Sequence, residues 1–558
     1  MAAETGASTG TEIPKREPTP PTSLGSIPQK RAFDDDHSPA VPSPLNPDVA
    51  SASELPPPDD ASQLKSSKPA RAKKDSFKKR ETKGGGRDSS PATPDHRSVK
   101  DQNNVDSPLR YKLAPPKPSD FELPRGPVMT LHHEVDGLGG RVEFFEASDH
   151  AASVFNKKNF RYTRCIADPL FPSTLYYRQT EPEPFGPRLS YEDAATSVFF
   201  DKSGRGATTD KGFRMARANV AVREGRWYWE CKITKGVREA AEPGAKPEGG
   251  KHVRMGWARR EASLDAPVGF DAYSYGIRDV AGEKVFMSRP KAFFPAGDGI
   301  REGDVIGLEI QLPSENMHRK IMSSTYNPAI DAPDDEPPPA AEAPNIVRDR
   351  VPIRFKAHTY FEKIEYHTTR ELEDLMNPSP IGSGSSSSES PNPLHTSPAL
   401  RTLPNSSIKI YKNGQLIGTA FENLFGFLPP ASKPQPQVGA REGLDDGMLG
   451  YYPAVSIFRG GAAEVNFGPD FWYPPPEYES APSGEEDTPE SRRKRLRAVS
   501  ERYKEQIAED IVYDVIDEVD FWMQDGGGAT DTTGVQEKSD AVAAAPGREE
   551  IKELVQDD

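Results

Sequence analysis

The side chains that most often perform catalysis form no recognisable catalytic pattern in this sequence. Ten histidines are scattered along 558 residues. The chain has no HExxH, GxSxG or GxxxxGK[ST] motif, the signatures of zinc proteases, serine hydrolases and phosphate-binding loops. The neighbours His132 and His133 are predicted to point to opposite sides of a strand. GLGGR at 137–141 departs from the GxGxxG dinucleotide motif, so we interpret it as a turn.

The two cysteines, Cys165 and Cys231, lie far apart and form no CxxC pair. They are too few for a disulfide framework or a four-ligand zinc site, which favours a reducing compartment. Neither has a nearby histidine that would form a nucleophile pair. We therefore expect no catalytic residue, no metal and no cofactor.

Composition predicts one folded core with long unstructured flanks. The hydrophobic share is 34%, with 57 prolines, 45 glycines and a formal net charge of −15. Globular chains typically use about 45–50% apolar residues, glycine included. No apolar stretch approaches the ~18 residues that would suggest a membrane span, and the first ten residues lack the apolar run of a signal peptide. We expect a soluble intracellular protein without membrane contact.

Residues 1–120 are predicted to be a disordered tail that contains a basic block at 65–87. The block has ten lysines and arginines against two acidic residues. Such a block indicates nuclear import or nucleic-acid contact, and a solvated linker is the alternative interpretation. Its densest part consists of Lys73, Lys74, Lys78, Lys79 and Arg80.

Residues 121–476 are predicted to form an all-β antiparallel sandwich. Aromatic and β-branched residues gather in short runs separated by turn residues. Trp227, Trp229, Cys231 and Ile233 alternate with polar residues, as expected for a strand with one buried face. Asn413-Gly414 indicates a tight hairpin. The predicted strands are 195–200, 213–222, 226–233, 252–258, 272–278, 304–312, 407–414, 415–421, 451–458 and 462–468.

Three segments rich in proline, serine or acidic residues interrupt the predicted sandwich, at 314–349, 377–405 and 429–447. Lengthening a loop costs only about 0.6 kcal/mol per doubling. We therefore expect them to be mobile insertions that leave the core intact.

A linker at 477–497, which ends in the basic run RRKRLR, precedes a predicted amphipathic helix at 498–525, and a disordered tail is predicted at 526–558. Apolar residues recur along one side of the helix at the spacing of helical turns. Periodicity leaves two alternatives open, because the stripe can pack on the sandwich or enter a partner's groove. The stripe consists of Ile507, Ile511, Val512, Val515, Ile516 and Val519.

Several runs resemble the SPRY (B30.2-like) domain, among them VREGRWYWECKI (222–233) and IYKNGQLIGTAFENLF (410–425). LDAPVGFDAYSYGIRD (264–279) and VNFGPDFWYPPP (465–476) more narrowly resemble the SPRY subunit of COMPASS-type histone H3 lysine 4 methyltransferase complexes, the absent-small-homeotic-2-like or Bre2-like family. The helical segment IAEDIVYDVIDEVD (507–520) resembles the part of that subunit that binds a dumpy-30-type homodimer.

The resemblance implies a non-catalytic nuclear scaffold that supports methyl transfer by a SET-domain subunit. It places the contact with an acidic segment of a WD-repeat β-propeller subunit on Phe213, Arg254, Pro267, Phe270 and Arg278. It assigns the helical stripe to the dumpy-30-type dimer, which favours the partner-binding alternative. Without the resemblance, Arg254 and Arg278 would be interpreted as ordinary surface residues.

The sequence departs from animal relatives in three respects. Phe213 and Phe270 stand where those proteins carry tyrosine, and Val280 stands where they carry lysine. The two cysteines cannot build the relatives' N-terminal zinc module. Any DNA or nucleosome contact is therefore expected from 65–87 or 492–497, and it would be weak and independent of base sequence.

Two other function classes compete with the scaffold hypothesis. One is a SPRY-type substrate receptor or adaptor for a ubiquitin ligase, although the cysteine count leaves no room for a zinc-binding ligase module. The other is an enzyme built on a β-sandwich, which would need a convergent polar site that the motifs do not show.

Overall fold

The structure is a computed structural model that describes the sandwich and the helix following it. Residues 1–115, which hold most of the predicted N-terminal tail with its basic block, and residues 525–558, which hold the whole predicted C-terminal tail, lie outside the described residues. The last part of the predicted N-terminal tail is described and contains the start of the short helix η2 (Pro118–Phe121). The described parts are 116–123, 126–137, 140–148, 162–169, 177–181, 183–238, 250–331, 352–355, 358–362, 365–377, 389–434, 445–478 and 493–524.

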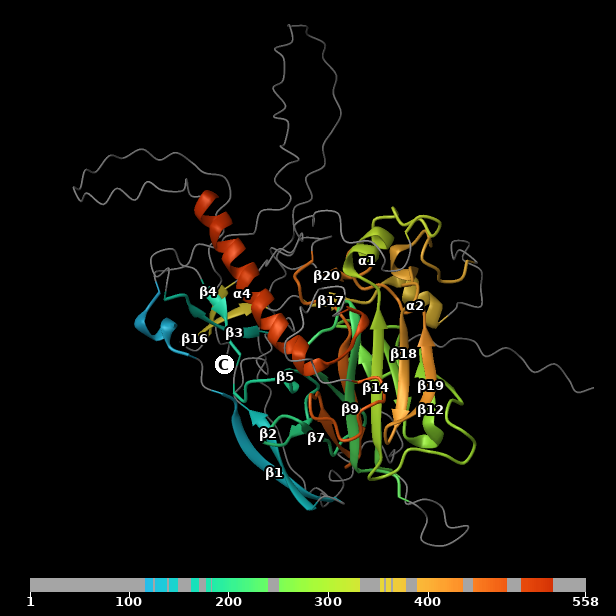
Figure 1. The fold of residues 1–558 in the computed structure, drawn as a ribbon. Coiled ribbons are helices and arrows are strands. Elements are labelled where there is room, and N and C mark those ends of the chain that lie inside the picture. The colour runs from blue at the N-terminus through green and yellow to red at the C-terminus, as the bar shows by residue number, and fades with distance from the viewer. Residues whose placement is uncertain are drawn as a thin grey trace, which may run out of the picture. The chain divides into compact units, whose positions relative to one another are not determined.

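The tryptophan-rich strand β9 (Gly225–Lys235) lies near the middle of a ten-stranded sheet. Its antiparallel neighbours are β14 (Val305–Leu312) and β22 (Ala462–Asn466), visible in part in Figure 1. The order is β1-β2-β6-β7-β22-β9-β14-β18-β19, and β23 pairs with β9 in parallel. The other strands are β1 Val128–Gly137, β2 Gly140–Ser148, β6 Phe199–Phe200, β7 Gly206–Thr208, β18 Ser407–Lys412, β19 Gln415–Glu422 and β23 Leu496–Ala498.

The second large sheet has seven antiparallel strands in the order β13-β12-β11-β10-β21-β8-β5. Each of the ten predicted runs contains a strand of one of these two sheets. The strands are β5 Leu189–Ala194, β8 Arg214–Ala218, β10 His252–Ala258, β11 Ser274–Arg278, β12 Glu283–Phe286, β13 Arg289–Lys291 and β21 Tyr452–Phe458.

The two sheets pack face to face around one apolar core. The rings of Trp229 on β9 and Trp257 on β10 meet edge to face, with centroids 6.2 Å apart. Trp227, Cys231 and Ile233 are buried in the same cluster. The all-β antiparallel sandwich and the alternation predicted for this strand are therefore confirmed.

The prediction that β9 buries only one face is wrong. Tyr228 and Glu230, on the outer face, are also fully buried. The segment after β22 covers them, since the Glu230 carboxylate accepts hydrogen bonds from the backbone N–H groups of Trp472 (2.7 Å) and Tyr473 (2.8 Å). A carboxylate buried in this way anchors the covering segment, because an unpaired buried charge would be costly.

Smaller elements surround the sandwich, and the sequence did not predict the small sheets. A four-stranded sheet joins β15 Pro352–Phe355, β16 His358–Glu362, β3 Tyr162–Ala167 and β4 Tyr177–Gln179, and β17 Tyr366–His367 pairs with β20 Lys433–Pro434. No helix among the described residues is both long and apolar enough to cross a membrane. The helices are η2 Pro118–Phe121, η4 Val280–Gly282, α1 Glu315–Met322, α2 Arg370–Met376, η5 Pro398–Leu400 and α4 Val499–Gln524.

His132 and His133 do not point to opposite sides of β1 as predicted. The pairing of β1 with β2 shifts register between Leu131 and His133, which marks a bulge. Both imidazoles consequently contact the ring of Phe199, with centroids 3.8 and 5.6 Å away. The sequence gives no sign of a bulge here, so strict alternation was the natural expectation.

Parts of the three predicted insertions pack into the core. α1 lies within the first, and Met317 and Ile321 on this helix are buried. Leu403 in the second and Ala431 in the third are also buried. Proline and serine content indicated loops, but it did not reveal the apolar side chains that hold the ends of these insertions on the sandwich. Residues 332–349, 378–388 and 435–444 of the insertions lie outside the described parts.

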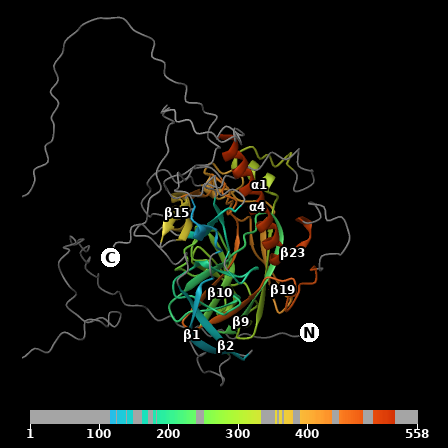
Figure 2. The ribbon, with the colours of Figure 1, turned by 90° about the vertical axis from the view of Figure 1, so that its left-hand side faces the viewer.

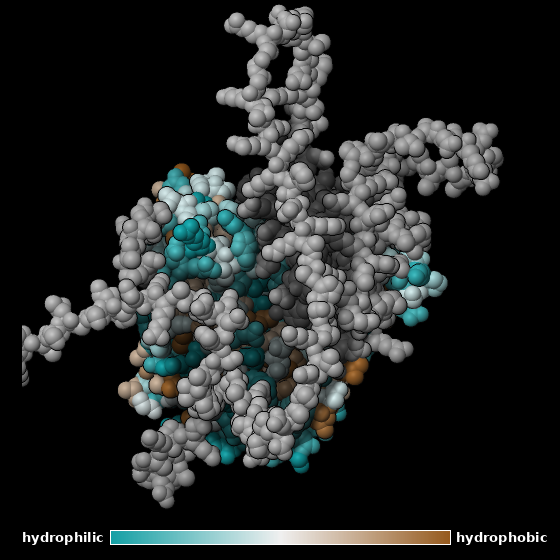
Figure 3. Space-filling model, turned by 180° about the vertical axis from the view of Figure 1, so that it is seen from behind, coloured by the Kyte–Doolittle hydropathy of each residue, from teal (hydrophilic) through white to brown (hydrophobic). Residues whose placement is uncertain are grey.

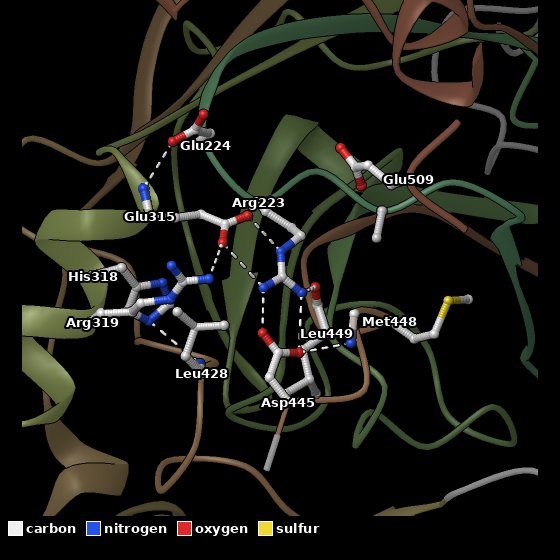
Figure 4. A network of polar contacts seen from close by, with 12 residues as sticks. Arg223, Glu224, Glu315, His318, Arg319, Leu428, Asp445, Met448, Leu449 and Glu509 are labelled. Atoms are coloured by element: carbon white, nitrogen blue, oxygen red, sulfur yellow. Dashed lines mark hydrogen bonds and ion pairs between the residues drawn. The ribbon is translucent and has the colours of Figure 1, made fainter. Parts of the chain in front are cut away.

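A buried ion network ties α1 and the 445–449 segment to the start of β9 (Figure 4). The guanidinium of Arg223 contacts Asp445 at 2.5 Å and Glu315 at 2.7 Å, and it donates to the Leu449 carbonyl at 3.1 Å. Burial alone would lower the pKa of Arg223, but these two carboxylates hold it above its usual value. The arginine thus remains charged in the interior and joins three segments.

Replacing Arg223 with methionine is expected to lower the free energy of unfolding by about 3–5 kcal/mol, because Asp445 would be left as an uncompensated buried charge. Urea denaturation of the full chain measures this change. The control Lys202→Ala removes an exposed ion pair with Glu143 and is expected to cost less than about 1 kcal/mol. Equal effects of the two substitutions would contradict the role assigned to the network.

Candidate protein-binding surfaces

Arg254 and Arg278 lie side by side on the outer face of the seven-stranded sheet. They are directly opposite each other in the antiparallel register of β10 and β11. Val253 and Met255 flank Arg254 and are buried in the core, so Arg254 points outward. The ring of Phe213, just before β8, lies 4.6 Å from the Arg254 guanidinium carbon. The fold therefore brings together three of the five residues expected to bind the propeller.

The two arginines make this surface receptive to an anion. Burial lowers the pKa of Arg254, and the positive charge of Arg278 lowers it further. Arg278 has an ion-pair partner in Glu283, whereas the Arg254 guanidinium makes no ion pair or hydrogen bond with the described residues. A carboxylate arriving between them would relieve this repulsion and accept charge-assisted hydrogen bonds.

Pro267 and Phe270 belong to a turn that lies against the same sheet. The Phe270 N–H donates to the Pro267 carbonyl at 3.0 Å. Two serine hydroxyls of the sheet hold the turn, because Val268 donates to Ser456 (3.0 Å) and Gly269 to Ser274 (2.9 Å). Ser456 is the register partner of Arg254 on β21, so the turn borders the arginine pair. The Phe270 side chain is 46% exposed.

Gly269 makes the close approach of this turn to the sheet feasible. Its φ is +83°, a backbone conformation that residues with a side chain rarely adopt. A Cβ at this position would also collide with the carbonyl of Val285 on β12. The Phe270 ring is therefore presented by a turn that tolerates little change.

Sequence reasoning missed two residues at this surface. Phe458, at the end of β21, packs against Phe213 with ring centroids 4.8 Å apart and supports the aromatic platform under Arg254. Glu283 holds Arg278 in place. The only signal for Phe458 was its outward position in a predicted strand, and nothing marked Glu283. Val280, in place of the lysine of animal relatives, is exposed and adds apolar surface beside Arg278.

Helix α4 is anchored firmly at its N-terminal end. β23 pairs with β9 and leads directly into the helix, and the Ser500 N–H donates to the Phe467 carbonyl at 2.9 Å. Gln506 accepts from the Ala221 N–H (3.1 Å), and Arg502 donates to the Ala221 carbonyl (3.0 Å). Figure 2 shows β23 at the foot of α4. These bonds determine the direction in which the helix leaves the sandwich.

Beyond this anchor the apolar stripe of α4 is exposed. All six residues assigned to it are exposed, with exposed fractions from 38% for Ile507 to 60% for Ile511. Other exposed apolar side chains are more scattered, and the face seen from behind shows small apolar areas in a mostly hydrophilic surface (Figure 3). The stripe is therefore not buried against the described strands of the sandwich, and its entry into a partner's groove stays a prediction.

The basic run at 492–497 is less available than its composition suggests. Arg497 pairs with Glu501 at 3.0 Å and with Glu505 at 2.5 Å, and its guanidinium carbon lies 4.3 Å from the Trp227 ring centroid. Arg495 also contacts Glu501, at 3.2 Å. The residues named for nuclear import or nucleic-acid contact, Lys73, Lys74, Lys78, Lys79 and Arg80, lie outside the described residues.

The described ranges hold no candidate metal centre. No group of three or more histidines, cysteines or carboxylates there is arranged to hold a metal ion. Both cysteines are buried, and burial raises the pKa of the Cys231 thiol far above its usual value. A thiol in this state is a poor nucleophile, because the thiolate is the reactive form.

Comparison with known proteins shows close relatives along most of the chain. "COMPASS component cclA" of Colletotrichum higginsianum is 61% identical over 98% of this chain and 99% of its own length. "Set1 complex component ash2" of Schizosaccharomyces pombe is 38% identical over 82% of this chain and 59% of its own length. A crystal structure of a human SPRY domain has 14% identity and a TM-score of 0.22, covering 50% of this chain and 98% of its own. No family model matches.

The exposed stripe predicts an unusual tolerance of charge on α4. Ile511→Asp is expected to change the free energy of unfolding by no more than about 0.5 kcal/mol, because the side chain is already in water. Val499→Asp, in the fully buried first turn of the same helix, is expected to cost at least about 3 kcal/mol. Chemical denaturation of both variants measures the difference. A large loss of stability for Ile511→Asp would mean that the stripe is covered within the chain.

Proposed function

Since the chain belongs to the family of COMPASS components that includes cclA and ash2, we propose that it is a non-catalytic scaffold subunit of a histone H3 lysine 4 methyltransferase complex. In this proposal it binds two other subunits and supports methyl transfer by a SET-domain subunit, which it meets through the complex. It acts in the nucleus, where its chromatin substrate lies. The observation that carries the proposal is the bare apolar stripe on a helix anchored to the sandwich.

The stripe of α4 is suited to a helical partner. A stripe at helical spacing binds in a groove between helices, where each buried aliphatic side chain contributes about 1.5–3 kcal/mol before ordering costs. The anchored half of α4 reduces these costs, because its direction is set before the partner binds. We assign the stripe to a dumpy-30-type homodimer.

The Arg254–Arg278 pair is suited to an acidic segment of a WD-repeat propeller subunit. Carboxylates of that segment would pair with Arg254, which makes no ion pair with the described residues, and with Arg278, which already pairs with Glu283. Phe213, Pro267 and Phe270 would contribute apolar contacts around these charges. With phenylalanine at 213 and 270, the contact relies on packing and carries no phenol hydrogen bond there.

Contact with DNA or the nucleosome is assigned to the basic block at 65–87. Its ten basic residues would bind phosphates weakly, without reading the base sequence, and with strong dependence on salt. Arg495 and Arg497 are already paired with glutamates, so the 492–497 run is the weaker candidate. Deleting 65–87 without any change in DNA affinity at low salt would contradict this assignment.

Substitutions at the two surfaces are expected to affect binding of the two partners independently. With the full chain, Val515→Asp is expected to abolish binding of the dumpy-30-type dimer and to leave propeller binding intact, because it places a charge in an apolar contact. Arg254→Ala is expected to weaken propeller binding roughly 10- to 100-fold, through loss of charge-assisted hydrogen bonds worth about 1.5–3 kcal/mol, and to spare the dimer. Calorimetric titration with each purified partner measures both.

Matched substitutions control for general effects of charge. Leu416→Asp places an acid at a similarly exposed apolar position on β19, away from α4, and Arg289→Ala removes an exposed arginine elsewhere on the seven-stranded sheet. Neither is expected to change either affinity. The proposal fails if the unaltered chain binds neither partner, or if it methylates histone H3 by itself.

A further inference from the structure

A cleft opens at the foot of α4 and continues the exposed stripe. It has a volume of about 710 Å³ and lies between α4, the segment around β4 and β5, and the four-stranded sheet. Figure 1 shows α4 running past β3, β4 and β16. Ile507 and Ile511 line the cleft and also belong to the stripe, so the two surfaces are continuous.

The described lining of this cleft is acidic. Seven carboxylates and three arginines line it, and no lysine is present among these lining residues. Two of the carboxylates are already paired, Asp193 with Arg217 and Glu181 with Arg188. Asp510 and Asp514 of α4 stand at one side and Glu183 at the other. Glu183 is exposed and makes no ion pair with the described residues. Negative charge on both sides of a cleft favours an occupant that carries lysine or arginine.

The rim of the cleft also exposes large apolar side chains. Phe185 is 69% exposed and Leu123 is 73% exposed. Both line the cleft together with the two isoleucines of the stripe. Exposed aromatic rings beside a hollow are typical of sites that bury another polypeptide.

The walls of the cleft are held in place without an occupant. The Tyr503 hydroxyl of α4 donates to the Glu181 carboxylate at 2.6 Å, across the base of the cleft. Asn219 donates to the same carboxylate (2.6 Å) and to the Gly186 carbonyl (2.9 Å). Arg188 donates to the Pro184 carbonyl at 3.1 Å, which holds the turn that presents Phe185. The cleft is therefore a preorganised surface.

We propose that this cleft is a second docking surface for the helical dimer that covers the α4 stripe, and that it receives a basic, partly apolar extension of that dimer. The proposal rests on the assignment of the stripe to such a dimer. A helix is about 10–12 Å wide with its side chains. A partner helix that covers Ile507 and Ile511 must therefore lie at the mouth of the cleft. An extension that continues from the end of this partner helix would meet the acidic lining and Phe185 first.

Full-length variants separate the cleft from the stripe. Phe185→Asp and Glu183→Lys change the cleft alone, whereas Val512→Asp changes a stripe residue that does not line the cleft. The control Leu416→Asp alters an equally exposed apolar residue on β19. Each variant is titrated with the purified dumpy-30-type dimer, and circular dichroism verifies that each is folded.

The variants are expected to lower the affinity for the dimer to different extents. Val512→Asp abolishes binding, Phe185→Asp and Glu183→Lys each weaken it about tenfold, and Leu416→Asp has no effect. Raising the salt concentration from 0.1 to 1 M weakens binding by the unaltered chain more than by Glu183→Lys, because salt screens the acidic lining.

Other outcomes overturn the inference in distinguishable ways. If Val512→Asp abolishes binding while both cleft variants bind like the unaltered chain, the cleft is not part of the interface and the proposed function stands. If the unaltered chain does not bind the dimer, the proposed function and this inference fail together. If Phe185→Asp leaves dimer affinity unchanged and dissociates a self-associated form of the chain in sedimentation experiments, the occupant is a second copy.

Discussion

The parallel pairing of β23 with β9 determines where the C-terminal helix begins and how it leaves the sandwich. The first turns of α4 are then held by two hydrogen bonds with Ala221, before β9, whose carbonyl accepts from Arg502 and whose N–H donates to Gln506. A helix held at one end cannot fold back to bury its other end. The exposed stripe at 507–519 follows from this constraint, and an apolar surface of this kind in water favours association with another polypeptide.

A second constraint shapes the outer face of the seven-stranded sheet, where antiparallel register places two arginines opposite each other. Glu283 compensates Arg278, and the Phe213 ring supports Arg254 without neutralising it. Arg254 therefore presents a positive charge that has no ion-pair partner among the described residues, next to apolar side chains. Helix α4 instead exposes an apolar stripe flanked by acidic residues. The two surfaces therefore differ in chemistry, one with paired arginines and the other with aliphatic side chains.

The sequence predicted the fold well where a short-range pattern decided it. Alternation in the tryptophan strand, the Asn413-Gly414 hairpin and the helical stripe each depend on local spacing, and each is present in the structure. The resemblance to the absent-small-homeotic-2-like family is confirmed by the relatives. The arginine pair came from that resemblance alone, because an outward arginine on a strand carries no sign of function.

Other features depended on contacts between distant segments, which no local pattern reveals. The bulge at His133, the burial of Glu230 under Trp472 and the buried ends of the insertions are of this kind. The cleft at the foot of α4 likewise combines residues from about 120 to 514. The roles proposed for the propeller-binding residues, the stripe and the basic block remain predictions.

Hydrogen exchange along α4, measured with and without the dumpy-30-type dimer, is the sharpest test of whether the exposed stripe binds a partner. Protected amides are expected at 499–506 in the free chain, with weaker protection at 507–519 that rises strongly when the dimer binds. Protection of 507–519 as strong as that of 499–506 in the free chain, or no change on adding the dimer, would contradict this expectation.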